Sequence, residues 1–339
     1  MHRKLVYRTF FVSVFSGEAH QHIDDTSTKV KGENAYCHIL CNPLYTVYHT
    51  TPRKDRLTVI DILWNGQTQY RLNDEAMAYL ERVGLSAKKR ARLWHLPRDV
   101  TFDADRLDRL LEERVPDLGP QQRKWVLEAM AVAAYHAQRD WPVVDLLVAD
   151  DAGQFKWITD DLALCWVHEG RHYKKLTPIV PLHRDQLTTF RKQFWAFYRD
   201  LSAYRQAPTE VERARLDANF DKLFRTVTGY AALDDRIAKT RAKKIALLQV
   251  LVHPEVPLHN NPAELGARQR VRKRDVSLGP RVPDGVRAWD TFATLAETAQ
   301  KLGVSFYAYI HDRISAQYQL PSLASLITER AFILNRATV

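Results

Sequence analysis

The sequence lacks long apolar runs, internal repeats and a usable set of cysteines. No stretch approaches the roughly 18 to 20 apolar residues needed to cross a bilayer, so we expect no membrane contact. The three cysteines, Cys37, Cys41 and Cys165, are too few and too odd in number for a disulfide framework, which agrees with a reducing cytoplasm. These absences predict a soluble, cytoplasmic protein whose cysteines belong to its core.

Positive charge exceeds negative charge. The 339 residues include 50 lysines and arginines against 40 aspartates and glutamates, a formal net charge of +10. With 45% hydrophobic residues, the chain is long enough to bury a full core. Net charge bears on association and not on fold, and here it favours a polyanionic partner such as nucleic acid.

The first third of the chain changes from strand-like to helical patterns. Strand patterns occur at 22–24, 35–41 and 45–50, with turn signals between them, and we expect β structure as far as Leu63. Helical spacing follows at 72–111 and 121–138. The nearly continuous apolar run Val143–Ala149 then predicts a central strand covered on both faces, which ends at Asp150.

The rest of the chain repeats this change. Residues 164–167 are strand-like, 185–251 are helical, and Asn260-Asn261-Pro262 begins one more helix. We therefore predict an α/β fold in which a mixed sheet core carries two helical insertions. The predicted parts are a short N-terminal segment at 1–19, core segments at 20–64, 142–178 and 253–313, helical insertions at 65–141 and 179–252, and a C-terminal helix or tail at 314–339.

Two aspartates stand at the ends of predicted strands. Asp24 follows His22-Ile23, and Asp150 follows the apolar run, with Asp25 and Asp151 as register alternatives. Two-metal phosphoryl transfer needs carboxylates that converge on two hard cations roughly 3.5 to 4 Å apart. An aspartate after a strand is, by itself, more often a turn or cap residue.

A third carboxylate precedes a run of positive charge. Glu264 lies in Asn261-Pro262-Ala263-Glu264, a pattern that also fits an ordinary helix N-terminus with a capping box. The residues just beyond it could neutralise a DNA backbone. The positive residues 268–274 are Arg268, Arg270, Arg272, Lys273 and Arg274; a second cluster contains Arg236, Lys239 and Lys243, and a third is Lys88-Lys89-Arg90-Ala91-Arg92.

Four of these segments, in this order, resemble the DDE-type transposases of bacterial insertion sequences, specifically the insertion-sequence sixty-six group. Asp24-Asp25-Thr26 resembles an Asp-Glu-Thr motif, with Asp25 in place of glutamate, and Asp150 with Phe155 resembles the second motif, with Asp151 in place of glycine. The remaining two are Cys165-Trp166-Val167-His168 with Arg171, which resembles a Cys-Trp-x-His-x-x-Arg segment, and Asn260-Asn261-Pro262-Ala263-Glu264 with Arg268, Arg272 and Lys273, which resembles the motif of the final glutamate.

The resemblance implies an RNase H-like core and a DNA transposase. It implies two Mg²⁺ ions, with Mn²⁺ as a substitute, held by Asp24, Asp150 and Glu264, which are also the catalytic residues. Water then attacks DNA at the element ends, and the freed 3′ hydroxyl is joined to a target, by a homo-oligomer assembled on DNA. The residues expected to contact DNA are Arg268, Arg272, Lys273, Arg274, Lys239 and Lys243.

Two features depart from the family pattern. Only 23 residues precede Asp24, where such transposases carry a DNA-recognition segment, so truncation is expected. The helical block before Trp141 is also longer than usual, which indicates a divergent branch. An alternative is therefore a DNA-binding protein that is descended from a transposase and no longer cuts DNA.

A zinc peptidase is a second alternative. His168-Glu169-Gly170-Arg171-His172 matches the zincin pattern of two histidines one helical turn apart with a glutamate as base. That motif requires a helix, whereas here it follows a strand-like run and contains glycine, so we expect it to be incidental. Cys37, His38 and Cys41 are expected to be core residues and not a metal site.

Overall fold

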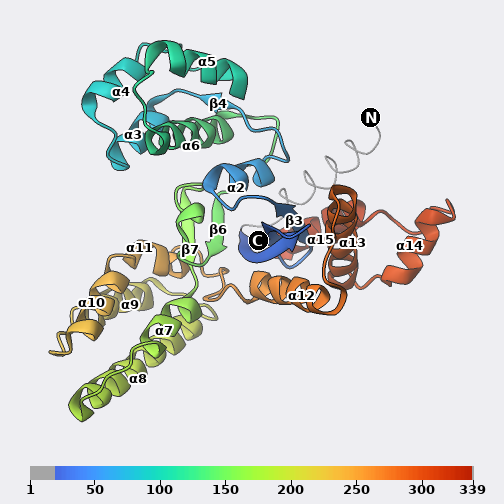
Figure 1. Cartoon of the computed structure of the whole chain (residues 1–339). Helices are drawn as coiled ribbons and strands as arrows, with labels where there is room; N and C mark the ends of the chain where they lie inside the picture. Colours follow the sequence, from blue (N-terminus) through green and yellow to red (C-terminus); the bar gives the residue numbers. More distant parts are fainter. Residues whose placement is uncertain (1–19, 338–339) are drawn as a thin grey trace.

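The computed structural model describes residues 20–337, with side chains described as far as residue 333. Its centre is a five-stranded mixed sheet in the order β3-β2-β1-β6-β7, with helices on both sides (Figure 1). This confirms the predicted mixed α/β class. The predicted N-terminal segment 1–19 lies outside the described residues. The strands of the sheet are β1 (Gln21–Val30), β2 (Glu33–Cys41), β3 (Thr46–Thr51), β6 (Leu146–Ala149) and β7 (Asp161–Leu164).

The first three strands form the antiparallel meander predicted from sequence. Val30 pairs with Glu33, so a two-residue turn closes the first hairpin. Both turn residues, Lys31 and Gly32, have positive φ, which is the geometry of the turn that matches strand twist. Glycine adopts such a φ without steric cost, so Gly32 fixes the register that places Asp24 opposite Ile39.

The remaining two strands run parallel to β1. Gln21 and His22 pair with Leu147 and Val148 of β6, and β6 pairs in turn with β7. All four residues of β6 are buried, as expected of an apolar run covered on both faces. The strand is shorter than the predicted 143–149, because its first regular residue is Leu146.

The free edge of the meander is covered by α13 (Pro283–Lys301). Three side chains of this helix, Asp290, Thr294 and Thr298, accept hydrogen bonds from backbone N–H groups of β3, at 2.7, 3.0 and 3.2 Å. The spacing of the helix residues matches that of the strand residues, since four residues of a helix rise about 6 Å and two residues of a strand about 6.8 Å. Edge N–H groups that would otherwise invite another strand are thereby satisfied.

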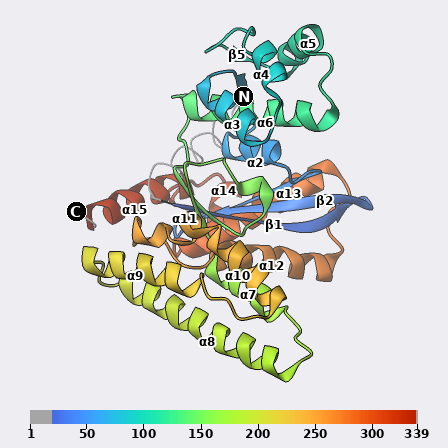
Figure 2. The same cartoon turned by 90° about the vertical axis from the view of Figure 1, so that its left-hand side faces the viewer.

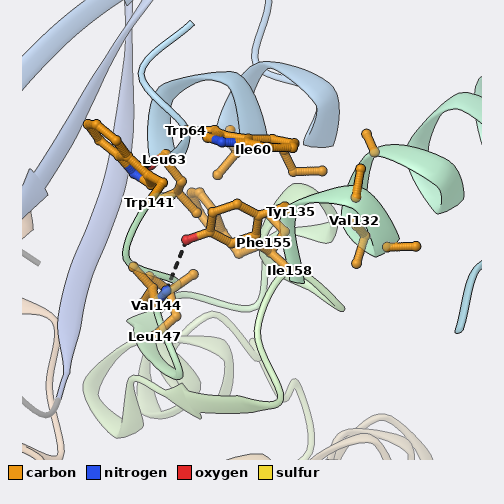
Figure 3. Close-up of a cluster of buried hydrophobic side chains, with 14 of the residues drawn as sticks. Ile60, Leu63, Trp64, Val132, Tyr135, Trp141, Val144, Leu147, Phe155 and Ile158 are labelled. Carbon is orange, nitrogen blue, oxygen red and sulfur yellow. Dashed lines mark hydrogen bonds between the residues drawn. The ribbon is translucent and has the colours of Figure 1, made fainter. Parts of the chain in front are cut away.

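The first helical insertion stands on one side of the sheet. It joins the sheet through a cluster of buried side chains around Tyr135, Trp141 and Leu147 (Figure 3). The backbone N–H of Val144 donates to the Tyr135 hydroxyl at 2.9 Å, and the indole of Trp141 donates to the carbonyl of Leu63 at 2.7 Å. The insertion contains β4 (Tyr70–Arg71), α3 (Asp74–Arg82), α4 (Ala87–Leu93), β5 (Thr101–Phe102), α5 (Ala104–Arg114) and α6 (Pro120–Ala137).

The second helical insertion lies on the opposite side of the sheet (Figure 2). It has a core of its own, in which the fully buried Trp166 is surrounded by the rings of Phe194, Phe197, Phe220 and Phe224. Its helices are α8 (Pro181–Tyr204), α9 (Glu210–Leu223), α10 (Ala231–Arg241) and α11 (Lys244–Leu247). After it come α12 (Asn261–Ser277), α13, α14 (Phe306–Ile314) and α15 (Leu323–Ala337).

Two local predictions were wrong. Residues 59–63, expected to be β structure, belong to helix α2 (Arg56–Leu63), which Asp55 caps by accepting a hydrogen bond from the N–H of Thr58. The strand expected at 164–167 ends at Leu164, and helix α7 (Trp166–Lys174) begins at once. Apart from Val167, which is half-buried, the apolar side chains of both segments are buried, so periodicity did not separate helix from strand. Among residues 20–337, no helix is long and apolar enough to span a membrane.

Candidate active site

Asp24, on β1, and Asp150, directly after β6, belong to neighbouring parallel chain segments. The pairing observed between the strands ends with His22 and Val148, two residues before each aspartate, and the charge of Asp150 acts on Asp24. Paired residues of neighbouring strands point to the same face of a sheet. Asp24 is half-buried on β1, and Asp150, half-buried just after β6, accepts a hydrogen bond from the N–H of Ala152 at 3.0 Å, which ends the strand.

Glu264 reaches this region from the first turn of α12. The helix packs across β1 and β2 at close range: a Cβ on Gly266 would lie 2.8 Å from a methyl of Ile39. The Tyr48 hydroxyl also donates to the carbonyl of Gly266, at 3.2 Å. A glycine at this position therefore lets the helix approach the sheet and brings Glu264 towards Asp24.

Asn260 ties the start of α12 to β1. Its side-chain amide donates to the carbonyl of Ile23 at 2.7 Å, and its oxygen lies 2.9 Å from Nδ1 of His22. Its backbone N–H donates to the sulfur of Cys165 at 3.3 Å. The structure does not contain the capping box that the sequence offered as an alternative. The N-cap is Asn260, whose side-chain amide binds β1 and not the helix, and Glu264 pairs with Arg171.

The three carboxylates share one electrostatic environment. The pKa of Asp24 is raised to about 7, first by burial and then by the negative charges of Asp150, Asp25 and Glu264, while the N–H of Asp25 opposes the rise. The guanidinium of Arg171 also interacts electrostatically with Asp24 and supplies positive charge to the cluster. The cluster is thus a half-buried concentration of negative charge, an environment that favours a bound cation.

Arg171 holds the third carboxylate. Its Nη2 lies 2.6 Å from Oε2 of Glu264, and this contact is the main reason that the pKa of Arg171 is raised. Among the described residues, no group of three or more His, Cys, Asp or Glu side chains is close enough together to hold a metal ion. The two aspartates and Glu264 therefore interact through space, with Glu264 directed towards a guanidinium.

The register alternatives are engaged elsewhere. Asp25 contacts the Lys54 ammonium at 3.1 Å and accepts from the amide of Gln154 at 2.6 Å. Asp151 lies 2.9 Å from the ammonium of Lys156 and 2.8 Å from that of Lys243. This arrangement favours Asp24 and Asp150 over their neighbours as the carboxylates available to a ligand.

The predicted DNA-contacting residues fall into two groups. Arg268, Arg272 and Lys273 are exposed on α12, and Arg268 and Arg272 continue the helix face of Glu264 at intervals of four residues. Arg274 is half-buried and donates to the carbonyl of Ser27 at 2.6 Å. Arg270 lies in the same positive run but faces the protein interior, where it is buried against Trp289 and pairs with Asp290 at 3.0 Å.

Lysines of the second cluster differ in the same way. Lys239 is exposed on α10 and pairs with Asp235 one turn away, at 2.7 Å. Lys243 is mostly buried and bridges Asp151 and Glu169, at 2.8 and 2.7 Å. Lys243 therefore links the segment after β6 to α7, and these two ion pairs leave little of its side chain exposed for the predicted contact with DNA.

The His-Glu-Gly-Arg-His segment is helical, contrary to expectation. His168 and His172 lie one turn apart on α7, with ring centroids 5.1 Å apart. Glu169, the base that a zincin would need, is buried and bound by Arg236, Thr240 and Lys243. Burial alone would raise the pKa of Glu169, but these partners outweigh it and lower the pKa. The segment thus supplies Glu169 to a buried network of ion pairs and hydrogen bonds, and it supplies Arg171 as the partner of Glu264.

Sequence reasoning missed the roles of three residues in this site. Asn260 and Arg171 both lay within the quoted motifs, yet only the fold shows that one binds β1 and the other binds Glu264. Cys165 was expected to be an inert core residue and is buried, and its sulfur accepts hydrogen bonds from the N–H groups of His168 and Asn260. Cys37 and Cys41 are buried core residues, as predicted.

Comparison with known proteins agrees with the motif order. A family model described as "Transposase IS66 family" matches residues 133–288, a range that contains Asp150 and Glu264. The chain is also 32% identical over 314 residues to "Uncharacterized protein y4jO" of Sinorhizobium fredii (strain NBRC 101917 / NGR234), which covers 91% of this chain and 96% of that protein. No solved structure matches the chain. We conclude that the chain belongs to the IS66 family of transposases.

Proposed function

We propose that this protein cleaves DNA at the ends of a mobile element and transfers the freed strand by a DDE mechanism, with Asp24, Asp150 and Glu264 as its catalytic carboxylates. The observation that carries the proposal is the convergence of their charges: residues from β1, from the end of β6 and from the first turn of α12 all act on Asp24. We further propose that the mixed sheet is an RNase H-like core, which the resemblance implies.

The donor chemistry of the site fits divalent cations. Asp24, Asp150 and Glu264 supply only oxygen atoms, which Mg²⁺ and Mn²⁺ prefer, and the negative charges of Asp150, Asp25 and Glu264 all act on Asp24. Two such ions would be held by these three carboxylates and would activate water and stabilise the leaving oxygen of a phosphodiester. Glu264 would have to exchange Arg171 for the ions, since the two side chains are paired.

The protein's own residues position the DNA. Arg268, Arg272 and Lys273 extend along α12 from Glu264, so a phosphate backbone that follows the helix passes beside the carboxylates. Phosphate contacts of this kind fix position and carry no sequence information. We also propose that the active form is a homo-oligomer assembled on DNA, working in the cytoplasm.

The test is metal-dependent cleavage. The purified chain is incubated with supercoiled plasmid in Mg²⁺ or Mn²⁺, and nicked and linear products are followed on a gel. Asp150→Asn is expected to abolish cleavage without changing the melting temperature by more than a few degrees. The control is Asp145→Asn, the same chemical change at an exposed residue that precedes β6, which should leave cleavage unchanged. DNA binding without any metal-dependent cleavage by the unaltered chain would instead identify a transposase-derived binding protein.

A further inference from the structure

A cavity of about 770 Å³ lies between the first helical insertion and the core. One wall is formed by α3 and α6 of the insertion, and the other by β2 and by the segments that follow β3 and β6. Neither the motifs nor the family model assigns it a role. Its volume is that of a small-molecule site, which a duplex would not enter but an unpaired nucleotide would.

The cavity opens beside the candidate carboxylates. Lys54 and Gln154 line it, and both bind the carboxylate of Asp25, the residue next to Asp24. Gly153, Gln154 and Trp157 belong to the segment that begins at Asp150. A strand that meets the carboxylates therefore has this cavity within the reach of a neighbouring nucleotide.

The lining contains both aromatic and cationic side chains. Tyr36, Trp125 and Trp157 are half-exposed, which leaves ring surface for a ligand. The positive residues are exposed or half-exposed: Arg53 and Lys54 on the core side, and Lys124 on the insertion side. Proteins that bind single strands combine these two features, because any base stacks on an aromatic ring and cations follow the backbone.

Buried hydrogen bonds connect the side chains at the floor of the cavity. Arg56 is buried and donates to Glu128 at 2.6 Å and to the carbonyl of Lys156 at 2.7 Å, and the Tyr79 hydroxyl donates to Glu128 at 2.9 Å. The charge of Glu128 is therefore neutralised within the protein, and Lys124 approaches it to 3.8 Å. The other carboxylate of the lining, Asp55, accepts hydrogen bonds from the N–H and the hydroxyl of Thr58, at 3.0 and 2.8 Å. Beside it, the cavity presents aromatic rings and the positive charges of Arg53, Lys54 and Lys124 to a ligand.

Trp157 is held in an unusual conformation at this floor. Its φ is 64°, in the left-handed region that residues other than glycine rarely adopt. Its ring packs edge-on against Tyr79, with centroids 5.3 Å apart, and the guanidinium groups of Arg56 and Arg82 lie 5.2 and 5.6 Å from it. Backbone strain that the surroundings maintain is concentrated at functional sites, and here it fixes an aromatic ring in the cavity.

We propose that this cavity binds one unpaired nucleotide of the DNA strand at the active site, with its base against the aromatic rings of Trp157, Trp125 and Tyr36 and its phosphate against Lys124 or Arg53. The inference rests on the proposed function, because it takes the strand to lie at Asp24 and Asp150. It goes beyond that function by assigning the first helical insertion a direct contact with DNA.

Fluorescence anisotropy with labelled 12-nucleotide probes tests the proposal, in EDTA so that no cleavage occurs. The probes are a single strand of thymidines, a strand of the same length with abasic sites, and a duplex. Trp157→Ala is expected to weaken binding of the thymidine strand about tenfold and to leave the abasic strand and the duplex within twofold. Trp94→Ala is the matched control, a half-exposed tryptophan of the same insertion outside the cavity, and it should change none of the three.

A second variant guards against misfolding of the first, because Trp157 packs on Tyr79. Lys124→Gln should lower the slope of binding against salt by about 0.7 for the single strand. Equal weakening for all probes, or none for the thymidine strand, overturns the proposal. Selective loss in a protein that never cleaves DNA would support the cavity and refute the proposed function, whereas cleavage with no selective loss would refute the cavity alone.

Discussion

The side chain of Asn260 fixes the protonated nitrogen of His22. The carbonyl of Ile23 only accepts hydrogen bonds, so the amide nitrogen of Asn260 faces it and the amide oxygen faces Nδ1 of His22, 2.9 Å away. Burial, above all, lowers the pKa of His22 to about 3, so the ring is neutral near pH 7 and its hydrogen is on Nδ1. These bonds join β1, which carries Asp24, to α12, which carries Glu264.

Asn260→Ala should therefore disturb both stability and site geometry. It leaves the buried carbonyl of Ile23 and the N–H of His22 unpaired, which costs about 1–3 kcal/mol for each group. We expect a lower free energy of unfolding in urea and a loss of cleavage larger than the loss of folded protein explains. Asn261→Ala changes the neighbouring exposed residue and should have little effect. Unchanged stability in Asn260→Ala would contradict this account.

A second prediction concerns Arg171. Its guanidinium is paired with the carboxylate of Glu264, to which cations are proposed to bind. Arg171→Met removes the guanidinium and leaves the carboxylates without a counter-charge. Because the arginine is half-exposed, the loss of stability without metal should be at most about 1 kcal/mol. Addition of Mg²⁺ should then raise the melting temperature of the variant more than that of the unaltered chain.

Differential scanning fluorimetry over a Mg²⁺ titration measures this difference. Lys174→Met serves as the control, because it removes one positive charge from an exposed position on the same helix. If both variants and the unaltered chain respond equally to Mg²⁺, Arg171 does not compete with the cation, and the proposed exchange of partners at Glu264 is refuted.

How far the sequence predicted this molecule depends on the kind of interaction. The meander, the central strand and the two blocks of helices were predicted because hydrophobic periodicity and turn residues act over a few positions. Segments 59–63 and 164–167 were assigned wrongly because nearly all their apolar residues are buried, which leaves no periodic pattern to separate helix from strand. Lys243 was expected on a DNA-binding face, yet Glu169 and Asp151 bind it, and those contacts depend on how α7 meets α10.

The buried ion pairs of Glu169 should contribute stability that depends on pH. Its pKa in the folded protein is lowered by Lys243, Thr240 and Arg236, which outweigh burial. A lowered folded-state pKa means that the stabilisation is present above the unfolded value of about 4.5 and is lost as the pH falls through the folded value. Glu169→Gln should therefore be destabilised at pH 7 by about 3 kcal/mol, since it leaves buried cations unpaired.

Urea unfolding at intervals between pH 7 and pH 3 checks both parts of this prediction. The gap between Glu169→Gln and the unaltered chain should narrow as the pH falls. Glu210→Gln, an exposed glutamate on α9, should run parallel to the unaltered chain throughout. A gap for Glu169→Gln that stays constant down to pH 3 would show that its effect is steric and not electrostatic.

The exposed face of α12 should determine how steeply DNA binding falls with salt. Each phosphate contact on duplex DNA contributes about 0.9 to the slope of log K against log salt concentration. Replacing Arg268, Arg272 and Lys273 together by alanine should lower that slope by about 2.7, measured by anisotropy with one duplex at several salt concentrations. The matched control replaces Arg106, Arg109 and Arg114 of α5, three exposed arginines on the far side of the first insertion (Figure 1). Both variants lose the same net charge, so a general loss of attraction would lower the slope equally in the two. A lower slope in the α12 variant, with an unchanged slope in the α5 variant, would show that the DNA backbone contacts α12.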